Sequence, residues 1–295
     1  HSDSKDVGLP PELSPFGDIT GDPAQRFGSN SLLLQKVLDF QSEVHRGDTN
    51  LNIAQGYQIV FLLSRFQKLF VKVLPVAGAL KAPEYCIMKQ LKHMKPIRQA
   101  PYKIKDPVRT YMKKALEKDV ENGLKFKPEA HEVVNTIPAF PVFQQEKMRI
   151  VGAFMQLNQA LILDAWPCPT TADTLGRMMN ASFRAAFDFK SGFMQNRKST
   201  PTVHRSVLIT MDGLYGSRGN DFGMKNSPQH FCRSINHIYK HNDNLHIHID
   251  DANAFTGSYP SFFKSMASFL LKTEEHHGYL KIAKLQIAPK RFKAV

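Results

Sequence analysis

Two adjacent carboxylates interrupt a stretch that otherwise has the pattern of an apolar β-strand. In "NLHIHIDDANAF", residues 244–255, isoleucine alternates with histidine before Asp250 and Asp251, and an apolar run follows. Alternate residues of a strand share a face, so the two histidines and Asp250 would line one face and the two isoleucines would be buried on the other. Charge among apolar neighbours is costly unless a positive group neutralises it. A hairpin that turns at the two aspartates would place both carboxylates at its tip.

A second carboxylate has the same surroundings. In "FRAAFDFKSGF", Asp188 lies between Phe187 and Phe189, which would both point to the opposite face of a strand. Two strands that each present an acid on one surface could hold two metal ions about 3.5–4 Å apart. Ligation by oxygen alone suits magnesium. Such a pair of ions activates an attacking oxygen and stabilises a leaving oxygen in phosphoryl transfer.

Two other interpretations of the aspartate pair remain open at this point. Adjacent aspartates are common in turns, where they have no further role. The run "HxHxDD" is also similar to the "HxHxDH" run of metallo-hydrolases, in which His246 and His248 would bind zinc. The final histidine of that run is absent here.

The net charge of +13 favours a polyanionic partner. Residues 92–127 carry eleven Lys and Arg against four Asp and Glu, and neutralised phosphates release counterions. Solvated helix faces are the alternative explanation. Three scattered cysteines indicate a reducing compartment rather than a disulfide framework. The sequence has neither an apolar run of membrane-spanning length nor a signal-peptide pattern, so no membrane partner is expected.

The order of the predicted elements indicates an α+β fold. A leader rich in Pro, Gly and Ser occupies residues 1–30, and helical spacing extends from 31 to 74. The periodicity and turn signals predict helices at 108–123, 171–179, 227–242 and 258–278, strands at 137–143, 147–154 and 182–189, and hairpins at 204–216 and 245–255.

From about residue 96 to 295, an ordered series of motifs resembles the reverse transcriptases of LTR retrotransposons and retroviruses, with the gypsy type most similar. "KMRIVGAFMQLN" is similar to the family's "KLRMCVDYRALN", and "LDAWPCPTTADTL" to "KDRYPLPRIDDLL". "FDFKSGFMQ" matches "LDLKSGYHQ", "DFGMKNSPQHFCRSI" matches "MPFGLTNAPATFQRLM", and "HIDDANAF" stands where the family has "YLDDILIF". Each motif alone is weak, but their common order is specific.

The resemblance implies the fingers and palm of a right-hand polymerase, with a mixed or antiparallel palm sheet backed by helices. The matched motifs place the fingers at 81–163 and 196–227 and the palm at 164–195 and 228–295. Residues 1–80 would be an N-terminal leader and helical extension of unknown role. The thumb and RNase H region would be absent from this chain, which is expected to be a fragment of a longer product because it begins with His1.

The resemblance also implies roles for individual residues. Asp188, Asp250 and Asp251 would be the catalytic and metal-binding acids, with Asp251 less direct, and the backbone carbonyl of Phe189 would be a further ligand. The general acid for pyrophosphate departure would be Lys281 or Lys284. The positions matched to nucleotide binding are Lys147, Arg149, Phe189, Phe193, Phe222 and Gly223.

Each nucleotide-binding position has a physical rationale and an alternative. Lys147 and Arg149 would hold the triphosphate, or they are an exposed cationic strand edge. Phe193 would exclude a ribose 2′-OH, or it is an ordinary core side chain. Phe222 would pack against the templating base and nucleotide, and Gly223 allows close approach of the backbone.

The chain departs from the family pattern at several positions. Ala153 and Met155 replace the Asp and Arg of "VDYR", His248 replaces the aromatic residue of "YxDD", and "NDFG" stands in place of "MPFG". These departures put nucleotide affinity and fidelity in doubt. All three acids are kept, and an unselected chain has no physical reason to keep carboxylates in an apolar strand.

The implied function is that of an RNA-directed DNA polymerase, which adds deoxynucleotides to a primer 3′-OH by two-metal phosphoryl transfer. The alternative is a catalytically degenerate polymerase fold that only binds nucleic acid. The implied cofactor is a pair of Mg²⁺ ions, with Mn²⁺ as a substitute. The implied partners are an RNA or DNA template with its primer, deoxynucleoside triphosphates and the remainder of a Pol polyprotein. The expected location is the cytoplasm or a virus-like particle.

Overall fold

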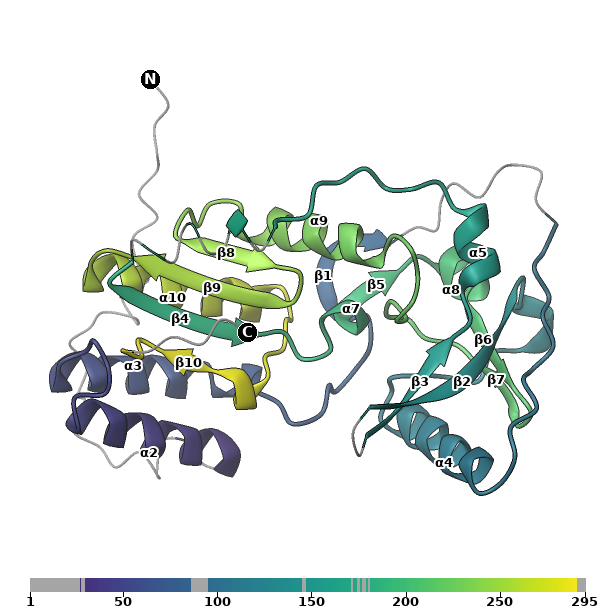
Figure 1. The fold of residues 1–295 in the computed structure, drawn as a ribbon, viewed down its shortest axis with the longest axis horizontal. Coiled ribbons are helices and arrows are strands. Elements are labelled where there is room, and N and C mark those ends of the chain that lie inside the picture. Colours follow the sequence, from purple (N-terminus) through teal and green to yellow (C-terminus); the bar gives the residue numbers. More distant parts are fainter. Residues whose placement is uncertain are drawn as a thin grey trace. The chain divides into compact units, whose positions relative to one another are not determined.

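The computed structural model describes residues 30–85, 95–144, 147–170 and 181–290, together with residues 27, 172, 173, 176 and 179 (Figure 1). Backbone contacts divide the chain into two compact units. Unit 1 comprises residues 1–72, 169–190 and 239–295, and unit 2 comprises residues 73–168 and 191–238. Among the described residues, no helix combines the length and the hydrophobicity that a membrane span requires.

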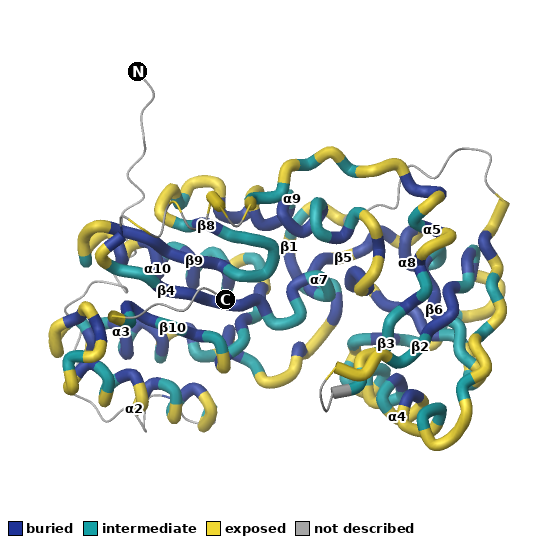
Figure 2. Tube along the Cα trace, viewed as in Figure 1, coloured by how far each residue is buried: buried dark blue, intermediate teal, exposed yellow. Residues whose placement is uncertain are grey.

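Unit 1 is built on a four-stranded antiparallel sheet in the order β10-β4-β9-β8 (Figure 1). Its strands are β4 (Phe183–Asp188), β8 (Leu245–His248), β9 (Asp251–Thr256) and β10 (Gln286–Ile287). The two middle strands, β4 and β9, are the most deeply buried part of the sheet (Figure 2). The predicted strand at 182–189 and the predicted hairpin at 245–255 are therefore confirmed.

Helix α10 (Tyr259–Glu275) packs on this sheet through aromatic side chains. The ring of Phe269 lies 4.7 Å from that of Phe187 and 6.0 Å from that of Phe189, measured between centroids. Phe187 and Phe189 are both buried and are two positions apart, so they share the face that meets α10. The intervening Asp188 belongs to the opposite face, as the alternation predicts.

Helices α2 (Ser31–His45) and α3 (Ile53–Arg65) confirm the predicted helical segment, which the structure divides into two helices followed by a 3₁₀ turn at Gln67–Leu69. A capping box begins α3: Asn52 Oδ1 accepts from the Gln55 amide at 2.9 Å, and Gln55 Oε1 accepts from the Asn52 amide at 3.0 Å. The two helices approach closely, since a Cβ at Gly56 would lie 3.0 Å from a methyl group of Val44.

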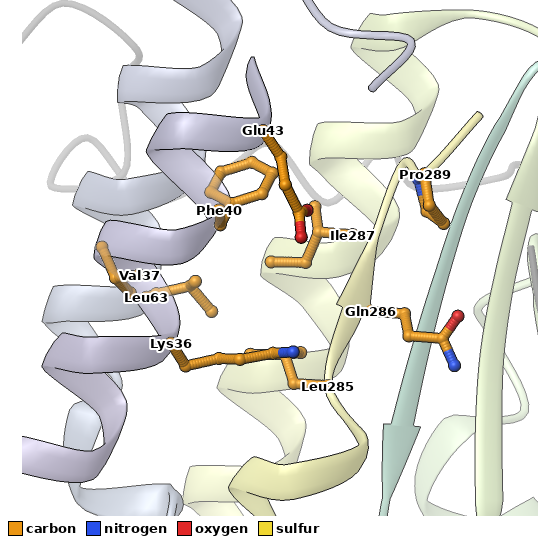
Figure 3. Close-up of a pocket in the computed structure, with 9 residues that line it drawn as sticks. All are labelled: Lys36, Val37, Phe40, Glu43, Leu63, Leu285, Gln286, Ile287 and Pro289. Atoms are coloured by element: carbon orange, nitrogen blue, oxygen red, sulfur yellow. The ribbon is translucent and has the colours of Figure 1, made fainter. Parts of the chain in front are cut away.

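A cavity of about 210 Å³ lies in unit 1 between α2 and the segment around β10 (Figure 3). Its walls are mainly apolar, with one lysine and one glutamate among them. The lining residues are Lys36, Val37, Phe40, Glu43, Leu63, Leu285, Gln286, Ile287 and Pro289. None of the predicted site residues belongs to this cavity.

Unit 2 contains a mixed four-stranded sheet in the order β3-β2-β6-β7. Its strands are β2 (Thr136–Gln144), β3 (Lys147–Gly152), β6 (Val207–Thr210) and β7 (Gly213–Tyr215). β2 pairs in parallel with β6, and the other two pairings are antiparallel. A separate parallel pair joins β1 (Leu80–Tyr85) to β5 (Asn196–Lys198). The predicted hairpin at 204–216 is confirmed: Met211 and Asp212 form its turn, and Gly213, at a φ of 133°, pairs with Thr210.

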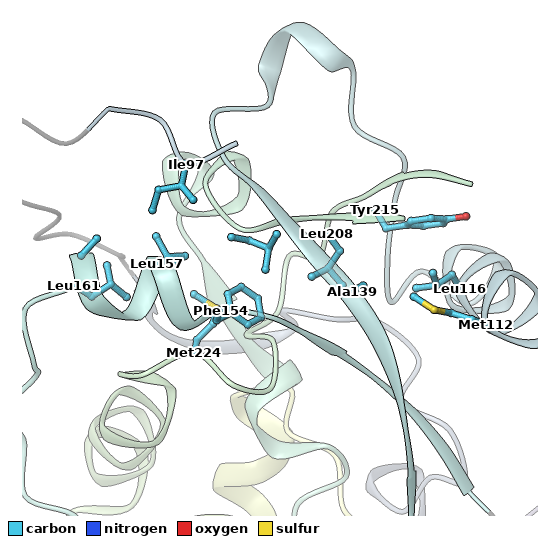
Figure 4. Packing of buried hydrophobic residues seen from close by; sticks show 12 residues of the cluster. Ile97, Met112, Leu116, Ala139, Phe154, Leu157, Leu161, Leu208, Tyr215 and Met224 are labelled. Atoms are coloured by element: carbon cyan, nitrogen blue, oxygen red, sulfur yellow. The ribbon is translucent and has the colours of Figure 1, made fainter. Parts of the chain in front are cut away.

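The core of unit 2 lies between this sheet and the surrounding helices (Figure 4). Helix α4 (Val108–Glu121) buries Met112 and Leu116 and is followed by Gly123 at a φ of 71°, which confirms the predicted helix at 108–123. The remaining described helices are α5 (Met155–Ala160), α7 (Gly192–Gln195), α8 (Thr200–His204) and α9 (Ser227–Tyr239). Further 3₁₀ turns lie at Ala130–Glu132 in unit 2 and at Ile282–Lys284 in unit 1. The prediction of an α+β fold is confirmed.

Parts of the predicted organisation lie outside the described residues. These are nearly all of the leader at 1–30, most of the predicted helix at 171–179, and Cys86. Cys168 and Cys232 are free thiols. The predicted limits of fingers, palm and N-terminal extension remain a prediction.

The predicted burial of the two isoleucines of "HIHIDD" is wrong. Ile247 and Ile249 are only half-buried, whereas His246 is 8 % exposed. β8 is the last strand of the described sheet and ends at His248, so Ile249 belongs to the turn rather than to the strand. An outer strand has less cover than a middle strand, and a turn does not continue the alternation.

We expect Phe269→Ala to destabilise the protein by about 3–5 kcal/mol, because it removes the ring that packs on both Phe187 and Phe189 and leaves a cavity. Urea unfolding measures this difference in the free energy of unfolding. Phe143→Ala is the control, because that ring is 60 % exposed, and its effect should stay within about 0.5 kcal/mol. Equal losses in the two variants would contradict the proposed packing of α10.

Candidate active site

Three acids from two distant segments meet at one end of the unit 1 sheet. Asp188 is the last residue of β4 and pairs in register with Asp251, the first residue of β9. Asp250 precedes Asp251 in the turn, and its backbone carbonyl accepts a hydrogen bond of 2.9 Å from the Phe189 amide. Asp188 is 5 % exposed, while Asp250 and Asp251 are half-buried. The sheet therefore brings together the three acids that the sequence singled out.

The tip that carries Asp250 is a two-residue turn held in a strained conformation. His248 pairs with Asp251 across the turn, which leaves only Ile249 and Asp250 in the loop. Ile249 has a φ of 55°, a region that β-branched residues rarely enter. Such strain costs on the order of 1–3 kcal/mol and persists only where the surrounding structure fixes it. One such restraint is His248, whose Nδ1 lies 2.9 Å from the carbonyl oxygen of Pro169.

The acid cluster carries an excess of negative charge in a partly buried setting. Burial raises the pKa of Asp250, and the neighbouring charge of Asp188 raises it further. Burial also raises the pKa of Asp251, where the charges of Asp250 and Asp188 act in the same direction and Lys284 opposes them. A positive partner therefore favours the ionised forms of Asp250 and Asp251.

Lys284 supplies that positive charge in this structure. Its Nζ lies 2.7 Å from Asp188 Oδ2 and 3.7 Å from Asp251 Oδ1. Burial lowers the pKa of Lys284, but its hydrogen bond to Asp188 and the surrounding acidic charge outweigh this and raise the pKa overall. The other predicted lysine, Lys281, donates its backbone amide to the Asp188 carbonyl at 2.8 Å, and its charge lowers the pKa of Asp250.

The acids fit a divalent cation by their chemistry, although they do not form a finished coordination set. Three carboxylates offer the oxygen donors that magnesium prefers, and burial together with neighbouring negative charge raises the pKa values of Asp250 and Asp251. Within the described residues, however, no three His, Cys, Asp or Glu side chains converge on one cation position. Binding would require Lys284 to release Asp188. The zinc interpretation of His246 and His248 gains no support from the geometry.

Three of the predicted nucleotide-binding residues come together in unit 2. Phe193, in α7, packs edge-on against Phe222 at 5.8 Å and against Phe231 at 5.7 Å between ring centroids. Phe222 is 45 % exposed. Gly223 has a φ of 93°, which explains why a glycine stands there, and its carbonyl accepts a hydrogen bond of 2.8 Å from Asn158 Nδ2.

The two predicted triphosphate ligands lie on strand β3, at the edge of the described unit 2 sheet. Arg149 is exposed and pairs in register with Val142. Lys147 is the first residue of β3, and its side chain lies outside the description. Phe189 belongs to unit 1, where its ring is buried against α10. The triphosphate role and the plain cationic strand edge both remain predictions.

Some contacts of the site were not foreseen from the sequence. Lys190 donates its amide to the Tyr279 carbonyl at 2.9 Å, and Phe189 pairs with Leu280, so the segment before Lys284 is joined to the end of β4. The only sequence signal for this arrangement was the position of "HGYLKIAKLQI" in the matched series.

No protein-family model matches the chain. Among curated proteins, the Pol polyprotein of transposon opus from Drosophila melanogaster is 30 % identical over 133 residues, which are 44 % of this chain and 13 % of that protein. An RNA-directed DNA polymerase homolog of Oenothera berteroana is 24 % identical over 111 residues, which are 37 % of this chain and 78 % of that protein.

Solved structures decide the fold. A foamy viral protease–reverse transcriptase in complex with double-stranded DNA superposes with a TM-score of 0.75 at 17 % identity, over 88 % of this chain and 45 % of that one. The fold is that of a reverse transcriptase. The same viral protein in complex with an RNA/DNA hybrid gives the same TM-score and identity and covers 34 % of that chain.

The resemblance to the reverse transcriptases of retroviruses and retrotransposons is thereby confirmed, while the closer affinity to the gypsy type remains a prediction. This chain spans less than half of each of these two structures and 13 % of the transposon polyprotein. Roles of individual residues do not follow from these similarities.

The raised pKa of Asp250 predicts that the contribution of this group to the free energy of unfolding rises as the pH falls. The folded pKa of Asp250 is above its unfolded value, so the folded state binds the proton more tightly than the unfolded state does. In a metal-free buffer, the unfolding free energy contributed by this group should increase as the pH falls from above the raised pKa to the unfolded value near 4. Urea unfolding at several pH values measures it, and Asp250→Asn should remove this part of the gain. An identical pH dependence in the parent and the variant would contradict the shift.

Proposed function

We propose that this chain is the fingers and palm of an RNA-directed DNA polymerase, which extends a primer by attack of its 3′-OH on a deoxynucleoside triphosphate. The observation that carries the proposal is the meeting of Asp188 with Asp250 and Asp251 at one end of the β4–β9 pairing, within a reverse transcriptase fold. The predicted fingers at 81–163 and 196–227 and palm at 164–195 and 228–295 belong to this proposal.

The three acids would hold two Mg²⁺ ions, for which Mn²⁺ would substitute. Bound divalent ions supply the positive charge that stabilises the attacking and leaving oxygens in phosphoryl transfer. Lys284, which neutralises Asp188 in the metal-free protein, would move off that carboxylate. An ordinary lysine has a pKa of about 10.4, so Lys284 would stay protonated after that move and would hold a proton for the departing pyrophosphate, with Lys281 as the other candidate.

Residues of unit 2 would bind the incoming nucleotide. Lys147 and Arg149 would hold the triphosphate, since a guanidinium matches phosphate oxygens in pairs and an ammonium adds a point charge. Phe193 would lie under the sugar. Because Phe222 and Phe231 back its ring, the ring would resist displacement by a ribose 2′-OH. Gly223 would let the backbone approach the base pair.

The proposed partner is a template–primer duplex. The matched viral proteins carry double-stranded DNA and an RNA/DNA hybrid, and the net charge of +13 on this chain suits contacts to phosphates. We further propose that the chain acts as part of a Pol polyprotein, in the cytoplasm or in a virus-like particle, as its free cysteines favour a reducing compartment.

Asp188→Asn and Asp250→Asn should each reduce primer extension at least about a hundredfold, because loss of a metal ligand exceeds the effect of losing an outer-shell partner. The measurement is incorporation of deoxynucleotides on an RNA template with Mg²⁺ or Mn²⁺. Asp48→Asn is the control, since that carboxylate in unit 1 is 58 % exposed and pairs only with Arg46 among the described contacts.

The same assay separates the two candidate functions. A protein that only binds nucleic acid would retain salt-dependent duplex binding in the parent and in both acid variants, with no incorporation at any metal concentration. Extension by both variants at the rate of the parent would rule out the two-metal mechanism.

Phe193→Ala should weaken discrimination against ribonucleotides by about tenfold or more, since it removes the bulk that would meet the 2′-OH. The ratio of kcat/KM for a deoxynucleotide to that for the matching ribonucleotide measures this effect. Tyr111→Ala serves as the control, because Tyr111 lies on α4 and is 60 % exposed. An unchanged ratio in Phe193→Ala would contradict the exclusion of the 2′-OH by this ring and would favour the alternative, an ordinary core side chain.

A further inference from the structure

A buried ion cluster lies next to the proposed nucleotide-binding residues of unit 2. Asp221 Oδ2 lies 2.8 Å from Lys198 Nζ, and Asp221 Oδ1 lies 3.3 Å from Lys125 Nζ. The side chains are 9 %, 0 % and 7 % exposed, in that order. Lys198 also donates to Ser206 Oγ at 2.9 Å. We refer to Lys125, Asp221 and Lys198 as the buried triad.

The buried triad joins three separate segments of unit 2. Lys125 follows α4, Lys198 ends β5, and Asp221 directly precedes Phe222. Burying charges carries a large desolvation cost, so such a cluster is weak support for stability in itself. Its geometry is directional, because one carboxylate is held between two ammonium groups. The cluster therefore joins the three segments through contacts of fixed direction.

The neighbouring contacts restrain the same segment on both sides of Phe222. Asn220 donates its amide to the Phe193 carbonyl at 3.2 Å. A Cβ at Gly219 would overlap the Met194 carbonyl oxygen, so the segment lies tightly against α7. After Phe222, the Gly223 carbonyl is held by Asn158. The ring of Phe222 thus lies at the surface between two restrained residues, Asp221 before it and Gly223 after it. Of these two, only Asp221 is charged.

The sequence marks this position as unusual. Where the family motif "MPFG" has proline before Phe-Gly, this chain has Asp221. Proline restricts the backbone through its ring, whereas aspartate has no such restriction and needs a partner to be fixed. Lys125 and Lys198 are those partners here.

We propose that Asp221 is a positioning residue, which through Lys125 and Lys198 holds Phe222 and Gly223 in place for the incoming nucleotide. This inference rests on the proposed function. In this inference, the ion pairs of the buried triad restrain the backbone at the position where the family motif "MPFG" has a proline ring.

Asp221→Asn in the full chain tests the inference with two independent measurements. Backbone amides of residues 217–224 should exchange with solvent about tenfold faster or more, since the anchor is lost. In primer extension, the KM for the deoxynucleotide should rise about fivefold or more while kcat changes less than about twofold. Lys198→Met should give the same pattern.

The matched control is Asp212→Asn. It breaks the ion pair of Asp212 with Arg109, whose two hydrogen bonds of 2.8 and 3.1 Å lie in the same unit. This variant should leave both the exchange of residues 217–224 and the KM at the values of the parent. If it changes them as Asp221→Asn does, general loosening of unit 2 explains the effect and the inference is overturned.

A triple variant, Lys125→Met/Lys198→Met/Asp221→Leu, separates folding from positioning. Apolar replacement of a whole buried ion cluster is often neutral or stabilising, so this variant should melt at or above the temperature of Asp221→Asn. Its exchange and KM should nevertheless remain raised, because the directional contacts are gone. Return of both values to those of the parent would overturn the inference.

Failure of the proposed function gives a different result. A parent that extends no primer would refute the polymerase proposal, and the exchange measurements alone would then decide whether Asp221 fixes the segment. A parent that extends primers, together with parental exchange and KM in Asp221→Asn, would refute the positioning role alone.

Discussion

The register between β4 and β9 is the constraint on which the rest of the site depends. The pairing extends from Phe183 opposite Thr256 to Asp188 opposite Asp251. Because successive side chains alternate between faces, this one ladder directs Phe187 toward α10 and Asp188 toward the other side. The packing that stabilises the sheet and the arrangement that gathers the acids are therefore consequences of the same pairing.

The acid cluster works against local stability, while the surrounding core supports it. Three carboxylates lie close together, two of them with raised pKa values, and Ile249 holds a backbone conformation that its side chain disfavours. These features persist because Phe269 and its neighbours fix the strands on one side and Lys284 neutralises charge on the other. A site that is prepared for added cations is expected to carry unfavourable charge without them.

Local patterns in the sequence predicted most elements, because apolar spacing and turn residues act over a few positions. The helix at 108–123, the hairpin at 204–216 and the acid-bearing hairpin at 245–255 are examples. The burial of Ile249 was predicted wrongly, since a two-residue turn interrupts the alternation that the prediction assumed. The partners of Asp221 could not be predicted: Lys125 is 96 positions away, and nothing local selects it. Strand alternation suggested that the acids could share a metal site, and the order of the motifs supported it, but neither gave the register that pairs Asp188 with Asp251.

The short β8–β9 hairpin makes the position of the acids sensitive to changes in chain length. The loop has only two residues and cannot absorb an extra one. Each shift of a strand by one residue moves its side chains to the opposite face of the sheet. A one-residue insertion or deletion within β9 would therefore shift its register against β4 and turn the carboxylate of Asp251 away from that of Asp188, even with every acidic residue intact. The position of the acids thus depends on the number of residues in this hairpin as well as on their identity.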